Sequence, residues 1–505
     1  MPQNSSIRGF LSRHADSLIA AALGFFVLTF YTRYSGIGIS PDSIMYISGA
    51  RNLNAHKGFT YFGDKPLVAF PLFFPTFLGI LLYITGIDPV VMGPVLTGLI
   101  FGCVIFLTGF ILERFTFPSK WYKWFILLAI ALSPSLLEIY SMLWSETLFI
   151  LWTLIFVIAY HHYIKSHTFG SLAIVAIITA FACVTRYAGV TLIGTGGMLL
   201  LFDPQLKLKT RIGHIAMFVV IASSLLATNL IHNALVTNTG TGPRYKSLTS
   251  LSENMHYFGT VMADWFTLSS HQYNLAFTIT LLLVLGFVAG FFYHAFRKKT
   301  TYKTYENILI AFFVVYALFM IISATISRYE RLNNRLLAPL FIPFLIGCSY
   351  WVVPFIRKQQ VKVKRMFYVL SLGIALLFLY GEYQIDYQRY DDQCDYGTPG
   401  YTDDDWNKSE LIKVMKTHPQ LFNPSYPIYN NACEAFYFFT GKSSEYIPKP
   451  TEPKQLRQFD TKPHGYIVMF NNLPDPALLT IPQIQQRKKQ LKALYQFEDG
   501  GIYEF

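Results

Sequence analysis

Asp42 is the residue of this sequence whose type and position most clearly suggest chemistry. It lies in the stretch Ser40–Tyr46, directly after the first hydrophobic span. A carboxylate at a membrane surface and at the start of a short helix can act as a general base toward a hydroxyl or an amine. A structural role is the alternative, because Pro41 suits a first helical turn and Asp42 could cap the free N–H groups of that turn.

Four further charged residues come from four other segments and are expected at the same face as Asp42: Lys65, Glu146, Arg186 and Arg335. Charges near the middle of a span would indicate translocation of an ion or substrate, but this chain places its charges at the rim. Ordinary explanations also exist. Glu146 can stabilise a helix start, and Arg186 can extend to lipid headgroups.

The segment 327–335 carries three arginines, Arg328, Arg331 and Arg335, on a loop that we expect on the outer side. Arginines there break the charge pattern of the rest of the chain. Since guanidinium groups bind phosphates and carboxylates through paired hydrogen bonds, we favour an external anion as their partner.

A long outer loop, about 236–274, contains Arg244 and His256. Most polar residues of this loop are expected to be solvated or to cap helices, and His256 has no acids at ligand spacing, so no metal site is predicted. Tyr46, Arg244 and His256 are candidate contacts to an acceptor or a sugar.

The composition identifies the elements that must position these residues. The 505 residues are 53% hydrophobic and only 14% charged, whereas soluble domains are about 25% charged. Segments of about 20 apolar residues, enough to cross roughly 30 Å of hydrocarbon, recur along the chain. They predict a polytopic α-helical membrane protein with about eleven spans, near 15–34, 89–112, 124–142, 147–163, 169–185, 188–202, 212–235, 275–295, 306–326, 336–356 and 366–381.

The net charge of +12 follows the membrane topology rather than indicating nucleic acid. With a cytosolic N-terminus, the inner loops hold eighteen Lys and Arg residues against four acidic ones, so the rest of the chain sums to −2. This is the positive-inside pattern, and it places the Asp42 loop and the C-terminal tail outside. The exit of the first span at Tyr31–Tyr34 lacks small residues for cleavage, which indicates an uncleaved anchor.

The tail from 382 to 505 drops abruptly in hydrophobicity. Its pattern predicts helices near 406–417, 433–440 and 482–493 and strands near 427–430 and 465–470, with a final strand pair. We therefore expect a membrane region, 1–381, with an outer loop 35–88, followed by a small extracytoplasmic α/β domain with a mixed sheet, 382–505. Cys394 and Cys433 lie in this tail, and an oxidising compartment would permit a disulfide between them.

Several short motifs, in this order, resemble the GT-C glycosyltransferases that use polyprenyl-phosphate sugars, such as protein mannosyltransferases and the lipid A aminoarabinose transferase. The resemblance covers most of the chain. The matching segments are 41–59, Lys65–Leu67, Leu143–Phe149, Thr185–Tyr187, Asn334–Pro339 and Ile428–Gly441.

The resemblance implies a role for each matching residue. Asp42 corresponds to the proposed base, Glu146 to a second acid that orients the acceptor or substrate, and Lys65 to a contact with the donor phosphate. Arg186, Arg331 and Arg335 would be further phosphate ligands. Ser43 departs from the acidic pair of protein mannosyltransferases, so a protein acceptor is not implied.

These residue types fit the chemistry independently. Transfer of a sugar from a lipid phosphate needs a base for the acceptor and cations for the departing phosphate. A single inverting displacement needs one essential carboxylate and no general acid, because the leaving group is already an anion. No cofactor is then required, although a divalent metal is possible. The expected partners are the donor, a lipid, glycan or protein acceptor, and membrane lipids, with no nucleic acid.

Two other classes remain open. A transporter or flippase would show inverted repeats and polar groups at mid-span, and we find neither in the sequence. A non-catalytic protein that binds glycans would leave Asp42 and Lys65 dispensable. The expected location is a bacterial cytoplasmic membrane with the site facing the periplasm. The sugar, the acceptor and the prenyl length are not specified by the sequence.

Overall fold

The computed structural model describes residues 7–266, 273–299, 301–328 and 330–505. The chain divides into two compact units. Unit 1 consists of the residues up to Arg33, Val68–Phe74 and Met92–Asp391. Unit 2 consists of Tyr34–Leu67, Pro75–Val91 and Asp392–Phe505. The segment that leads into Asp42 therefore shares a compact unit with the C-terminal tail.

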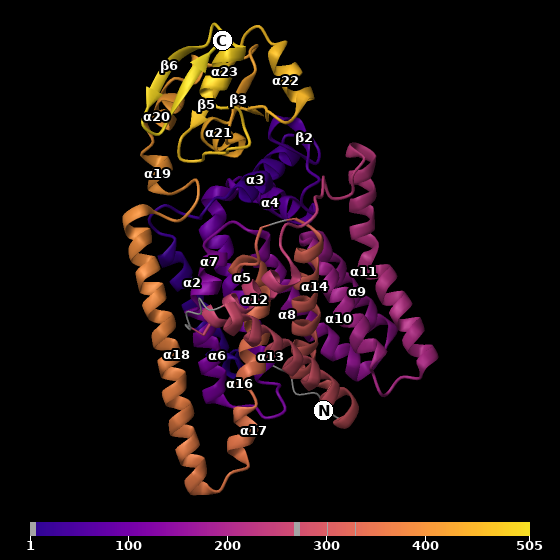
Figure 1. The fold of residues 1–505 in the computed structure, drawn as a ribbon. Coiled ribbons are helices and arrows are strands. Elements are labelled where there is room, and N and C mark those ends of the chain that lie inside the picture. Colours follow the sequence, from indigo (N-terminus) through magenta and orange to yellow (C-terminus); the bar gives the residue numbers. More distant parts are fainter. Residues whose placement is uncertain (1–6, 267–272, 300, 329) are drawn as a thin grey trace. The chain divides into compact units, whose positions relative to one another are not determined.

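Unit 1 is built from helices (Figure 1). They are α1 (Ile7–Arg13), α2 (Ala15–Tyr31), α5 (Pro89–Leu112), α6 (Lys120–Ala131), α7 (Pro134–Tyr140), α8 (Ser145–Ser166), α9 (Phe169–Thr185), α10 (Val190–Leu201), α11 (Leu208–Thr237), α12 (Leu251–Asp264), α13 (Tyr273–Phe292), α14 (Tyr305–Ile326), α15 (Asn334–Leu337), α16 (Phe341–Ser349), α17 (Val352–Arg357) and α18 (Val361–Tyr396).

The described helices confirm a polytopic membrane protein. Seven are long and apolar enough to cross a membrane, and the bent pair α6 and α7 makes an eighth candidate. Shorter apolar helices include α2, α9 and α10. Each of the eleven predicted spans overlaps one of these helices.

The predicted span 124–142 is divided by a 50° bend between α6 and α7. Pro134 occupies the first turn of α7, and the Ser133 hydroxyl caps that turn by accepting from the Leu136 N–H. A proline has no N–H to continue the preceding helix, so the chain restarts a helix at this point.

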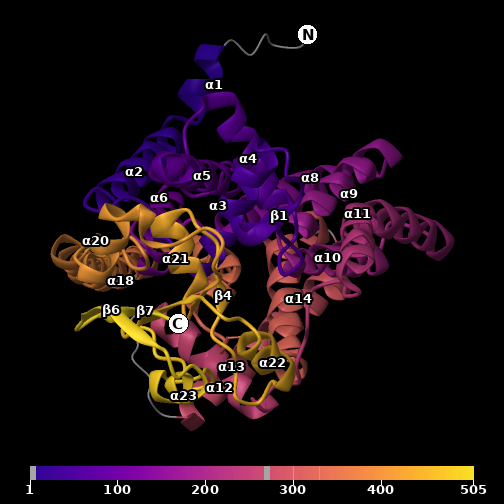
Figure 2. The same cartoon turned by 90° about the horizontal axis from the view of Figure 1, so that it is seen from above.

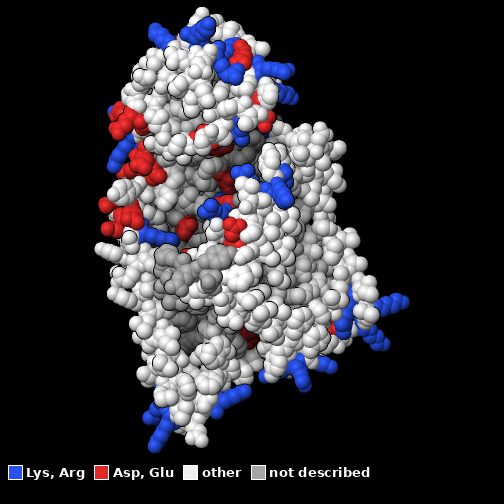
Figure 3. Space-filling view, viewed as in Figure 1, with Lys and Arg blue, Asp and Glu red and all other residues white. Residues whose placement is uncertain are grey.

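Helices α8, α9, α10 and α11 lie side by side, as Figure 2 shows from above. At one end of unit 1, Lys and Arg gather in and beside the connections between α10 and α11 and between α17 and α18, and Figure 3 shows basic residues along the lower edge. They are Lys207, Lys209, Arg211, Arg357, Lys358, Lys362, Lys364 and Arg365. Lys123 of α6, which the sequence predicts among the basic residues of the inner loops, differs from that expectation. Lys123 is buried and ion-paired with Asp16 (Nζ–Oδ1, 2.6 Å) and with Glu113, so it fixes α2, α5 and α6 together.

Helix α18 is longer than the span predicted from hydropathy. It continues without a break through the acidic residues Asp386, Asp391, Asp392 and Asp395 to Tyr396. One face of the polar second half lies against the rest of unit 1, because Glu382 and Asp386 are buried while most of their neighbours on the helix are exposed. The Arg389 guanidinium donates to the Pro134 carbonyl at 2.7 Å.

The C-terminal part of unit 2 is an α/β domain with a mixed sheet, as predicted. The sheet order is β4-β3-β5-β7-β6, with β4, β3 and β5 parallel and β7 and β6 antiparallel to their neighbours. Its elements are α19 (Asp404–Asn407), α20 (Glu410–Thr417), β3 (Ile428–Asn430), α21 (Cys433–Thr440), β4 (Glu445–Tyr446), α22 (Pro453–Asp460), β5 (Tyr466–Phe470), α23 (Ile481–Arg487), β6 (Lys492–Phe497) and β7 (Gly500–Glu504).

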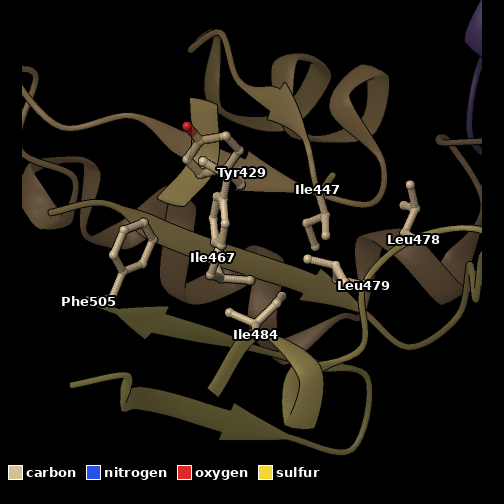
Figure 4. Close-up of a cluster of buried hydrophobic side chains, with 8 residues drawn as sticks. Tyr429, Ile447, Ile467, Leu478, Leu479, Ile484 and Phe505 are labelled. Carbon is tan, nitrogen blue, oxygen red and sulfur yellow. The ribbon is translucent and has the colours of Figure 1, made fainter. Parts of the chain in front are cut away.

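A cluster of buried apolar residues around Tyr429, Ile467 and Phe505 forms the core of this domain (Figure 4). Two details differ from the sequence prediction. The helix expected near 482–493 ends at Arg487, because the following residues form β6 against β7. The helix expected over 406–417 is interrupted, since Ser409 caps a new helix, α20.

Cys394 and Cys433, for which a disulfide was one possibility, are both free. Cys433 is buried at the start of α21, and burial raises the pKa of its thiol to about 12. A thiol with that pKa stays protonated at neutral pH and is a poor nucleophile.

Candidate active site

Glu146 lies in the first turn of α8 and is almost completely buried, with 1% of its surface exposed. A carboxylate in the first turn interacts favourably with the positive end of the helix dipole. The residue before the helix, Trp144, makes no side-chain capping bond. Burial of an ionised carboxyl at this depth requires opposite charges.

Two arginines from other helices supply those charges. Arg186, at the end of α9, places its Nη1 2.5 Å from Glu146 Oε2, and Arg335, in α15, places its Nε 2.5 Å from Oε1. Arg186 also donates to the Ser145 hydroxyl at 3.1 Å. The three residues predicted from separate segments are therefore in direct contact, and together they carry a net charge of +1.

The Arg335 guanidinium is held on several sides. It lies 4.2 Å from the centre of the Trp144 ring, a distance at which a cation binds an aromatic face. Its Nη1 is 3.8 Å from Glu330. Glu146 thus orients two guanidinium groups whose planar donors suit a phosphate.

Asn334, the residue before Arg335, anchors this cluster to neighbouring helices. Its Nδ2 donates to the Ser135 carbonyl (3.1 Å) and to Glu138 (3.0 Å), and its Oδ1 accepts from the Trp265 indole N–H (2.8 Å). In the sequence, Asn334 stands out only as the first residue of the motif Asn334–Pro339. Glu138 and Trp265, which fix it, were not selected as site residues.

In unit 2, Asp42 lies in the first turn of α3 (Pro41–Asn54) and is partly exposed. The N-cap of this helix is Ser40, whose hydroxyl accepts from the Ser43 N–H at 3.3 Å, while the Ser43 hydroxyl accepts from the Ser40 N–H at 3.1 Å. Ser40 and Ser43 thus form the capping box of this helix, and Asp42 is not its N-cap residue.

The backbone before Asp42 is fixed by the tail of the same unit. The Tyr401 N–H donates to the Ile39 carbonyl at 2.8 Å, and Gly400 lies against that carbonyl with φ +106°. A Cβ at Gly400 would lie 2.3 Å from the Ile39 oxygen, so only glycine permits this approach. The position of Asp42 depends on the tail from Gly397 onward as well as on its own helix.

The same helix is tied to the hairpin of β1 (Thr60–Tyr61) and β2 (Lys65–Pro66) and to α4 (Phe73–Thr85). Arg51 pairs with Asp88 at 2.8 Å, Asn54 donates to the Gly79 carbonyl at 2.8 Å, and Asn52 donates to the Thr60 hydroxyl at 3.0 Å. Tyr46 is buried within unit 2.

Lys65 lies in β2, opposite Tyr61, and is half-buried. It lines a cavity of about 450 Å³ in unit 2 that also contains Lys442, Ser443 and Glu445. Two lysines in one cavity suit an anionic ligand.

The remaining candidates lie on the loops and on α12. Arg331 is exposed, with its guanidinium 5.7 Å from the Tyr257 ring, and Arg244 is exposed and donates to the Thr241 hydroxyl at 3.1 Å. His256 is half-buried on α12, next to Tyr257. The described residues contain no group of three or more His, Cys, Asp or Glu side chains that could hold a metal ion.

The arrangement of helices and C-terminal sheet is the GT-C type of fold, in an integral membrane protein. The structure is similar to that of ArnT from Cupriavidus metallidurans bound to undecaprenyl phosphate, over 99% of this chain and 98% of the other, with a TM-score of 0.55 and 11% sequence identity. It is also similar to the archaeal oligosaccharyltransferase AglB from Archaeoglobus fulgidus in complex with an inhibitory peptide and a dolichol-phosphate. That likeness covers 90% of this chain and 69% of the other, with a TM-score of 0.57 and 10% identity. No family model and no curated protein matches the sequence.

Proposed function

We propose that the protein transfers a monosaccharide from a polyprenyl-phosphate donor to an acceptor at the outer face of the membrane. The observation that carries this proposal is the buried cluster in which Glu146 holds Arg186 and Arg335. Two oriented guanidinium groups with a net positive charge are what a departing lipid phosphate needs. The likeness of the fold to two proteins whose structures hold undecaprenyl phosphate or a dolichol-phosphate supports the same reaction class.

The proposed reaction is a single inverting displacement. Asp42 removes the proton from the acceptor hydroxyl or amine as that group forms a bond to C1 of the sugar. The bond between C1 and the phosphate oxygen breaks, and the electron pair leaves with the phosphate. Lys65, Arg186, Arg331 and Arg335 are the proposed phosphate ligands, while Tyr46, Arg244 and His256 are proposed contacts to the acceptor or sugar.

The membrane topology that we propose follows the charge pattern of the sequence. The basic loops of unit 1 face the cytosol, the location is a bacterial cytoplasmic membrane, and residues 382–505 with the loop 35–88 face the exterior. The membrane region, 1–381, would hold the prenyl chain between apolar helices.

Purified protein reconstituted in vesicles tests the proposal. The vesicles receive radiolabelled polyprenyl-phosphate mannose, or one of a small panel of other sugar donors, together with membrane extract as a source of acceptor. We expect label to enter a new product, and Asp42→Asn to reduce the rate more than about a hundredfold.

Asp64→Asn is the matched control, because Asp64 is an exposed carboxylate of the same unit that contacts only Lys57 among the ion pairs of the described residues. This variant is expected to stay within about twofold of the wild type, the level of an exposed pair. Consumption of no donor on the panel, or equal transfer by Asp42→Asn, would contradict the proposal.

A further inference from the structure

A cavity of about 490 Å³ lies within unit 1, apart from the residues assigned to the reaction. It is formed where the start of α7, the end of α12, the residues around Asn334 and the second half of α18 meet. Its volume is that of a site for a small organic molecule. Asn334 lines the cavity, and the next residue, Arg335, contacts Glu146.

Glu382 of α18 lines this cavity and is 1% exposed, yet neither of its carboxyl oxygens hydrogen-bonds another described residue. Asp386, one turn further along α18, is also buried, and its oxygens likewise make no hydrogen bond among the described residues. Buried polar groups in folded proteins almost always have a partner. Of the two, Glu382 lines the cavity, and a buried carboxyl of this kind in a cavity wall points to a ligand that brings hydrogen-bond donors.

The nearest arginine is already engaged. Arg389, which also lines the cavity, lies 3.2 Å from Glu138 and donates to the Pro134 carbonyl. The Asn334 amide is used by Ser135, Glu138 and Trp265. The Arg389 guanidinium and the Asn334 amide are thus already engaged by other residues of unit 1, whereas the Glu382 oxygens are not.

Aromatic rings form much of the remaining wall. Trp265 is fixed by its bond to Asn334 and by an edge-to-face contact with Phe341, with ring centres 5.3 Å apart. Tyr257 contributes a second ring. An aromatic face opposite carboxyl acceptors matches a ligand with an apolar C–H face and hydroxyl groups at its edge.

We propose that this cavity binds a single hydroxyl-rich sugar ring, with Glu382 accepting hydrogen bonds from the hydroxyls and Trp265 or Tyr257 packing against the ring face. The choice of a sugar among donor-rich ligands rests on the proposed function. The sugar can belong to the donor or to the acceptor.

Equilibrium dialysis of the full chain in detergent tests the proposal. The probes are the radiolabelled methyl glycosides of mannose, glucose, galactose and arabinose, with ethanolamine as an ammonium-bearing comparison. At least one glycoside should bind saturably, and Glu382→Leu should weaken its binding about tenfold to a hundredfold, the effect of leaving a buried hydroxyl donor of the sugar without its acceptor. Asp391→Asn, an exposed carboxyl on the same helix, should not change binding.

The unfolding temperature separates a ligand-binding acid from a structural one. Because Glu382 has no hydrogen-bond partner among the described residues, Glu382→Leu and Glu382→Gln should unfold at or above the wild-type temperature. If no glycoside binds the wild type, if ethanolamine binds instead, or if Glu382→Leu lowers the unfolding temperature and keeps the glycoside, the proposal is overturned.

Two lipids identify the source of the sugar. If the cavity holds the donor sugar, Glu382→Leu weakens binding of polyprenyl-phosphate mannose but not of polyprenyl phosphate. If the cavity holds the acceptor sugar, Glu382→Leu leaves the binding of both lipids unchanged and abolishes binding of the methyl glycoside. These binding experiments do not measure sugar transfer, so the two proposals can fail separately. If label is transferred but no glycoside binds, only the proposed sugar site in the cavity is contradicted. If a glycoside binds but no label is transferred, only the proposed reaction is contradicted.

Discussion

Two acidic residues of unit 1, Glu146 and Glu382, are equally buried, at 1% exposure each, but differ in their surroundings. Glu146 contacts two guanidinium groups at 2.5 Å. Glu382 faces a cavity, and its oxygens hydrogen-bond no other described residue. The difference shows that burial alone does not reveal what a carboxyl does; the charges around it do.

The first arrangement is complete within the protein and positions cations, whereas the second leaves acceptors for a molecule from outside. A buried pair of opposite charges is costly to break, because removal of one partner leaves the other uncompensated. A buried carboxyl without a donor is itself a cost. Substitutions at the two positions should therefore change stability in opposite directions.

The largest expected effect is that of Glu146→Gln. Removal of this charge leaves the half-buried guanidinium groups of Arg186 and Arg335 beside a buried neutral amide, which should lower the free energy of unfolding by about 3 kcal/mol. Chemical unfolding in detergent, followed by circular dichroism, measures this change. A variant as stable as the wild type would show that the arginines do not depend on Glu146, and the contrast with Glu382 would be lost.

Asn334→Ala should affect both regions. The substitution removes the partner of the Trp265 indole and of Glu138, so we expect a loss of about 2–3 kcal/mol in the free energy of unfolding. Transfer and sugar binding should both weaken in the same preparation. If only sugar transfer or only sugar binding changes, α15 does not couple the Glu146 cluster to the cavity.

Arg335→Lys tests the geometry of the cation rather than its charge. Lysine keeps the charge but cannot reproduce the fork of donors or the packing on Trp144. We expect transfer to fall about tenfold to a hundredfold, which corresponds to about 1.4–2.8 kcal/mol, with little change in stability.

Arg297→Lys is the control for that comparison. Arg297 is an exposed residue at the end of the short π-helix Tyr293–Arg297 that follows α13, in the same unit. Equal transfer rates of Arg335→Lys and Arg297→Lys would argue that only charge matters at the Glu146 cluster.

The smallest effect is a gain. Glu382→Leu should raise the free energy of unfolding by about 1–2 kcal/mol, because an apolar side chain replaces a buried carboxyl. The same unfolding experiment as for Glu146→Gln measures it. If Glu382→Leu lowers the free energy of unfolding instead, Glu382 stabilises the fold as Glu146 does, and the contrast between the two residues is lost.

Much of the fold could be predicted from the sequence, since hydropathy identifies spans wherever a helix is apolar over its whole length. The prediction for α18 stopped too early because Glu382 and Asp386 resemble the start of a polar tail. Their spacing of four residues, with Arg389 three further on, places them on one helical face. That spacing was the one available signal, but the partner helices that bury this face are distant in sequence.

The candidate site was predicted unevenly for a similar reason. Glu146, Arg186 and Arg335 were selected because each is a charge at the rim of a span, and the structure shows them in contact. Asn334 and Trp265 are neutral, and their importance arises from a hydrogen bond across 69 residues. At Asp42, local pattern was ambiguous because Ser40 and Asp42 are both good caps, and only the backbone geometry distinguishes them.

Helix α15 has four residues, and two of them serve different regions: Asn334 lines the cavity and Arg335 binds Glu146. Successive residues of a helix are rotated by about 100°. A shift of α15 by one residue, caused by an insertion or deletion before it, would therefore turn the amide and the guanidinium away from their partners at once. Evolution can vary these two regions by substitution but not by changes in the length of this segment, so loop length here should be more strictly maintained than residue identity in the surrounding loop.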